Sequence, residues 1–68
     1  MELHVNGEDR TFDETELTVE QLLDHLDIEG GRGVAVAVNE DVVLGSEWQT
    51  RELSDGDTVE IIRATQGG

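Results

Sequence analysis

One short segment, residues 17–27, most constrains the fold, because it combines a helix start with a single apolar stripe. Thr18 and Gln21 form a capping box, in which each side chain satisfies a free backbone donor of the first helical turn. We predict a helix over residues 19–27 that Gly30-Gly31 stops, and its apolar face must be buried against another layer. The residues that supply a hydrophobic staple and the stripe are Leu17, Val19, Leu22, Leu23 and Leu26.

The remaining apolar patterns have the two-residue period of strands, with turn residues between them. Asn6-Gly7 marks a hairpin turn, and the run of alternating valines and alanines is typical of a central strand with two different faces. In the last strand, Val59 and Ile61 are expected to point inward. The predicted strands are residues 2–6, 10–13, 34–38, 42–44 and 58–63, with turns at 39–41 and 53–57 and a helical turn or loop at 46–49.

These elements predict an α+β domain, in which one helix packs on one face of a mixed sheet whose first and last strands are adjacent at its centre. Residues 1–63 form this domain, and residues 64–68 are expected to be a mobile tail with nothing to hold it. Phe12 is interpreted as a core residue. Trp48 is expected to pack on the sheet rather than to sit at an interface.

No set of side chains predicts catalysis. The chain has no cysteine, which excludes a disulfide framework, a thiolate nucleophile and a cysteine zinc site. His4 and His25 are isolated, so no metal site is predicted. The glycine-rich residues 30–33 lack the lysine of a phosphate-binding loop and are interpreted as a turn. A core this small favours a carrier, a modifier or a binding module over a self-sufficient enzyme.

Charge limits the partners. Seventeen acidic residues against four arginines, with no lysine, give a net charge of −13, which excludes nucleic acid and disfavours anionic membranes. The acidic residues are spread along the chain, so we favour a salt-loving organism over one basic partner as their explanation. No signal peptide is recognised and no apolar run approaches the roughly 20 residues of a membrane span. We therefore expect a cytoplasmic protein.

Two features point to partner proteins. Ile62, together with Ala35 and Ala37, is expected to form an exposed apolar patch on the sheet face opposite the helix. The chain ends in Gly67-Gly68, and glycine has no side chain to obstruct passage of a carboxylate along a narrow channel. The end of the chain is therefore the candidate functional group.

In this order and spacing, several motifs resemble the sulfur-carrier family of thiamine biosynthesis (ThiS), within the ubiquitin-like β-grasp group. They are the valine-alanine strand ending at Asn39, Val42-Val43 followed by Trp48, Leu53, Asp55-Gly56-Asp57 with Val59, and the terminal Gly67-Gly68.

The resemblance implies that the chain is a carrier, itself the substrate of an adenylating enzyme similar to ubiquitin-activating enzymes. That enzyme uses ATP, and the carrier binds no cofactor. A sulfur donor then displaces AMP from Gly68, and the resulting thiocarboxylate supplies a thiazole synthase. Gly67 is the steric requirement, Ile62 and Ala64 are the expected partner-binding residues, and the free carrier is expected to be a monomer.

Three alternatives remain open at this point. The small subunit of a molybdopterin-forming enzyme uses the same tail chemistry. A ubiquitin-like modifier of archaeal type would be joined through Gly68 to lysines of other proteins. An inert binding domain would be unaffected by removal of Gly67-Gly68.

Overall fold

The computed structural model describes residues 1–28 and 33–64. Five of the seven strands in these ranges form one sheet, and a two-stranded pair lies beside it. The elements in chain order are β1 (Glu2–Val5), β2 (Glu8–Thr11), β3 (Leu17–Thr18), α1 (Val19–His25), β4 (Val34–Val38), β5 (Asp41–Val43), the 3-10 turn η1 (Gly45–Glu47), β6 (Glu52–Leu53) and β7 (Thr58–Arg63).

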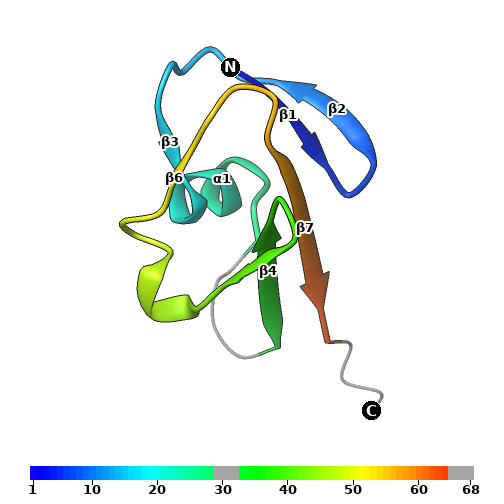
Figure 1. Ribbon diagram of the computed structural model, residues 1–68, viewed down its shortest axis with the longest axis vertical. Coiled ribbons are helices and arrows are strands. Elements are labelled where there is room, and N and C mark those ends of the chain that lie inside the picture. Colours follow the sequence, from blue (N-terminus) through cyan, green and yellow to red (C-terminus); the bar gives the residue numbers. More distant parts are fainter. Residues whose placement is uncertain (29–32, 65–68) are drawn as a thin grey trace.

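The sheet has the strand order β2-β1-β7-β4-β5 (Figure 1). β1 and β7 are parallel neighbours, whereas the β1–β2, β4–β5 and β4–β7 pairs are antiparallel. The predicted mixed sheet, with the first and last strands adjacent at its centre, is therefore confirmed. The last strand, β7, lies between β1 and β4.

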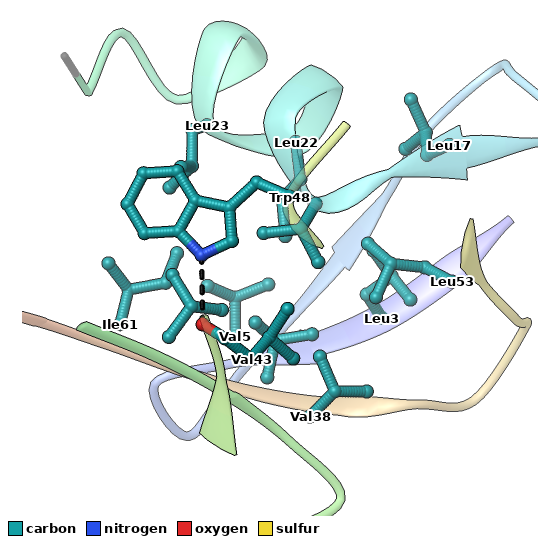
Figure 2. Close-up of a cluster of buried hydrophobic side chains, with 13 residues drawn as sticks. Leu3, Val5, Leu17, Leu22, Leu23, Val38, Val43, Trp48, Leu53 and Ile61 are labelled. Carbon is teal, nitrogen blue, oxygen red and sulfur yellow. Dashed lines mark hydrogen bonds between the residues drawn. The ribbon is translucent and has the colours of Figure 1, made fainter. Parts of the chain in front are cut away.

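The core lies between α1 and the inner face of the sheet (Figure 2). Leu22 of α1 and Val59 of β7 are fully buried. Trp48 follows η1, is 9% exposed, and donates from Nε1 to the carbonyl oxygen of Val43 at 3.0 Å. Trp48 is therefore a packing residue, as predicted. Phe12 is only partly buried, and its ring centroid lies 5.4 Å from that of His25 in an edge-to-face arrangement.

The predicted capping box is present, because Gln21 N–H donates to Thr18 Oγ1 and Thr18 N–H donates to Gln21 Oε1. The helix ends at His25, however, and not at Asp27. Asp27 adopts a φ of +59°, and the amide of Ile28 bonds the Leu23 carbonyl at 2.9 Å. These features form a Schellman motif, which normally has glycine at the left-handed position. Aspartate tolerates the left-handed conformation, but it is not a sequence signal for it. The prediction that Gly30-Gly31 ends the helix is therefore wrong.

Other boundaries also differ from the prediction. The return strand of the hairpin is β2 at residues 8–11 rather than 10–13, because both Asn6 and Gly7 have positive φ and form a two-residue turn. β5 begins one residue earlier than expected. The β3–β6 pair, in which Leu17 faces Leu53, was not predicted, since two-residue strands have no detectable period.

Candidate functional site

The candidate site is the C-terminal end of β7, from which the chain continues to its terminal glycines. β7 alternates as predicted, with Val59 and Ile61 buried and Glu60 and Ile62 exposed. Gly67 and Gly68 lie outside the described residues. The structure therefore shows the strand that presents the tail, and its last described residue is Ala64.

Ala64 continues the ladder of the sheet. Its amide donates to the carbonyl oxygen of Gly33 at 2.5 Å, directly after the Val34–Arg63 pair of β4 and β7. Gly33 has a φ of +83°, and a Cβ added there would lie 3.4 Å from the Ala64 Cβ. The expectation that nothing holds Ala64 is therefore wrong. Four residues remain beyond it, which in extended form reach about 13 Å.

On the side of β7 that faces away from β4, the side chain of Asn6 makes the hydrogen bonds that a neighbouring strand would make. Its Nδ2 donates to the Ile61 carbonyl at 3.2 Å, and its Oδ1 accepts from the Ile61 amide at 2.8 Å. The backbone amide of Asn6 also donates to the Val59 carbonyl at 2.9 Å. One side-chain amide thus satisfies both backbone groups of Ile61, a contact that the Asn6-Gly7 turn signal did not reveal.

The outer face of the sheet, opposite α1, carries the predicted apolar patch. Ile62 is 63% exposed, and the pairing register places it beside Ala35 on β4. Val42, 72% exposed, faces Ala37 across the β4–β5 pair, and Leu44 follows at 61% exposure. We call these five residues the outer patch. Sequence reasoning missed Val42 and Leu44, although their alternation with the buried Val43 could have indicated them.

Among the residues that the structure describes, the titratable side chains do not converge into a catalytic or metal-binding group. His4 pairs with Asp9 on the hairpin, and His25 Nε2 lies 3.0 Å from Glu14 Oε2. Within residues 1–28 and 33–64, no three histidine or carboxylate side chains are placed to hold a metal ion. In the same part of the chain, no helix has the length and apolar character needed to cross a membrane.

Comparisons with known proteins show which family the chain resembles. The sequence profile of the ThiS family matches residues 3–68. The chain is 41% identical over 64 residues to the sulfur carrier protein ThiS of Thermus thermophilus, covering 94% of this chain and 95% of that protein. It is 40% identical over all 68 residues to part of a thiazole synthase of Paramagnetospirillum magneticum, and spans 20% of that protein's length.

Among solved structures, the crystal structure of a thiamine biosynthesis protein (ThiS) from Geobacter metallireducens superposes with a TM-score of 0.85. Its sequence is 33% identical, and the match covers 100% of both chains. An NMR solution structure of a thiamine biosynthesis protein from the same organism gives a TM-score of 0.83 over 88% of its length. The mixed sheet with one packed helix is thus the ubiquitin-like β-grasp fold that the sequence predicts.

Proposed function

This chain belongs to the ThiS family, and on that premise we propose that it is a sulfur carrier for thiazole formation whose reacting group is the carboxylate of Gly68. The observation that carries the proposal is the 41% identity to the Thermus thermophilus sulfur carrier over nearly the full length of both proteins. The chain is a small carrier protein, and the chemistry on its tail is performed by partner enzymes.

The first step is activation. A carboxylate is a poor acyl donor until one of its oxygens becomes part of a good leaving group. An adenylating enzyme joins a Gly68 carboxylate oxygen to the α-phosphorus of ATP, and pyrophosphate leaves. A sulfur donor at the oxidation level of sulfide then attacks the acyl carbon, the bond from that carbon to the AMP oxygen breaks, and the sulfur stays on the carbon as a thiocarboxylate. Because this step consumes ATP, we place it in the cytoplasm.

The body of the domain acts by delivering the tail. The pairing of Ala64 with Gly33 fixes where the tail leaves the sheet, so the carboxylate can enter a site about 13 Å deep. Gly67 leaves bare backbone next to the reacting group. Ile62 lies on β7, the strand that leads into this tail, and the rest of the outer patch lies beside it on β4, on β5 and at Leu44. We propose this patch as the docking surface for the adenylating enzyme.

Similarity to part of a thiazole synthase supports an enzyme of that class as the sulfur acceptor. In the Paramagnetospirillum magneticum protein, a segment similar to this whole chain occupies a fifth of one longer polypeptide. Joining a carrier to its acceptor makes their encounter intramolecular and raises the effective concentration. We propose that a thiazole synthase takes the sulfur from the carrier described here.

The test is the intact mass of the protein after incubation with the adenylating enzyme of its host, ATP and a sulfur donor. We expect a gain equal to replacement of one oxygen by one sulfur. A matched chain lacking Gly68 should show no gain, because its new terminus stops one residue short of the reaction centre. If the full chain stays unchanged while the enzyme activates another carrier, the proposal is wrong.

A further inference from the structure

The pairing of β7 leaves one part of its edge open. Backbone N–H and C=O groups of one strand residue point to the same side, and successive residues alternate. The Thr58 carbonyl accepts from Asn39 on the β4 side, and the Val59 carbonyl accepts from Asn6 on the β1 side. Arg63 has the same parity as Val59. Its amide and carbonyl therefore point away from β4, toward the side of β1.

No strand formed by the described residues meets Arg63 on that side. β1 ends at Val5 and the hairpin turns back at Asn6-Gly7, so it covers only the first half of β7 (Figure 1). The Asn6 side chain occupies the edge at Ile61, two residues before Arg63. Arg63 takes part in none of the turn, loop and strand-end backbone hydrogen bonds between described residues, and in its pair with Val34 it has the parity whose backbone groups point away from β4. Arg63 thus presents one backbone donor and one backbone acceptor at the edge of β7, to which a further strand can pair.

A groove of about 440 Å³ lies along this open edge, between the hairpin, the end of α1 and β7. Its apolar lining includes Leu26, Ile28 and Ile61, and Arg10 and Arg63 also line it. This volume lies within the range of about 300–1,000 Å³ that is typical of ligand sites. We call it the β7 groove.

Charge indicates what the β7 groove binds. The chain has only four arginines, and two of them line this groove. Arg10 lies 3.7 Å from the carboxylate of Glu8, whereas Arg63 has no ion pair with any described residue. Asp27 also lines the groove. Of the two arginines that line the groove, Arg63 is thus the one without an ion pair to a described residue, and its guanidinium can recognise a carboxylate from outside.

We propose that the β7 groove receives an extended segment of the adenylating enzyme, which adds to the edge of β7 at Arg63 and carries an acidic side chain that pairs with its guanidinium. Main-chain hydrogen bonds supply affinity in this mode of recognition, and the ion pair supplies specificity. The contact lies one residue before Ala64, so it aligns the tail with the enzyme at the point where the tail leaves the domain. This inference rests on the proposed function and names a second surface besides the outer patch.

Two substitutions separate the side-chain contact from the backbone contact. Arg63→Ala removes the guanidinium and should raise the KM of the enzyme for the carrier about fivefold, equivalent to ~1 kcal/mol. Arg63→Pro also removes the amide that points into the groove, while leaving the bonds to β4 intact, and should raise KM about fivefold further. Arg51→Ala removes the same charge outside the groove and should change KM less than twofold. For all variants, kcat should stay within twofold.

Hydrogen exchange tests the same contact without a substitution. The Arg63 amide should exchange rapidly in the free carrier and at least tenfold more slowly in the complex with the adenylating enzyme. Equal exchange in both states would overturn the inference, as would KM values of both Arg63 variants that match Arg51→Ala. Protection by a thiazole synthase alone would show that the occupant is wrong. If the wild-type chain gains no sulfur, both the proposed function and the inference about the β7 groove are wrong. If the wild-type chain gains sulfur but neither the Arg63 variants nor the Arg63 amide responds, only the inference about the β7 groove is wrong.

Discussion

Replacing Asn6 tests how the end of β7, from which the tail continues, is held by the side-chain hydrogen bonds to Ile61. Asn6 has a φ of +51°, a left-handed conformation that glycine adopts freely and alanine adopts at a cost of about 1–2 kcal/mol. Asn6→Gly therefore removes the two side-chain hydrogen bonds to Ile61 without adding backbone strain. Asn6→Ala removes the same bonds and adds the strain. The difference between the two variants isolates the backbone contribution.

The magnitude follows from the two bonds, which measure 2.8 and 3.2 Å and are partly buried. At about 0.5–1.5 kcal/mol each, their loss should lower the free energy of unfolding by roughly 1–3 kcal/mol in Asn6→Gly. The loss in Asn6→Ala should be larger by about 1–2 kcal/mol. A chain of this length has a total of only about 3–10 kcal/mol, so both variants lose a substantial fraction of their stability.

Urea unfolding followed by the fluorescence of Trp48, the single tryptophan, measures these differences at fixed salt. Trp48 is buried in the core and reports its opening. Amide exchange at Ile61 gives the local counterpart and should accelerate in both variants. If Asn6→Gly is as stable as the wild type, the bonds to Ile61 contribute nothing. If glycine and alanine destabilise equally, the argument from φ is refuted.

Other measurements check the core, the helix start, the outer patch and the charge. Trp48→Phe leaves the buried Val43 carbonyl without its donor and should cost about 1–3 kcal/mol in urea unfolding. Thr18→Ala breaks the capping box and should lower the free energy of unfolding by ~1 kcal/mol, whereas a neutral effect would mean that the cap is dispensable. Ile62→Ser should change stability by less than about 0.5 kcal/mol, because the side chain is mostly exposed, yet should raise the KM of the adenylating enzyme. The melting temperature should rise from low to molar salt, since screening relieves the repulsion of a net charge of −13, and a flat or falling midpoint would contradict this.

Features that depend on neighbouring residues could be predicted closely. The capping box at Thr18 and the start of α1 follow from side chains that bond within one turn. The alternation in β7 follows from the two-residue period of a strand, which places Val59 inside and Ile62 outside whatever lies beside them. The helix end was missed because Asp27, not a glycine, takes the left-handed position.

The sequence by itself thus determined the period of each element, the α+β class and the terminal Gly67-Gly68 that the proposed chemistry requires. Only the tertiary structure decided how the end of β7 and Ala64 are held, because those contacts join residues far apart along the chain. Asn6 reaches Ile61 across 55 positions, and Ala64 is fixed by Gly33. No local pattern encodes such pairs, since strand register is set by which apolar faces are buried together, and the open edge at Arg63 exists only because β1 ends before β7 does.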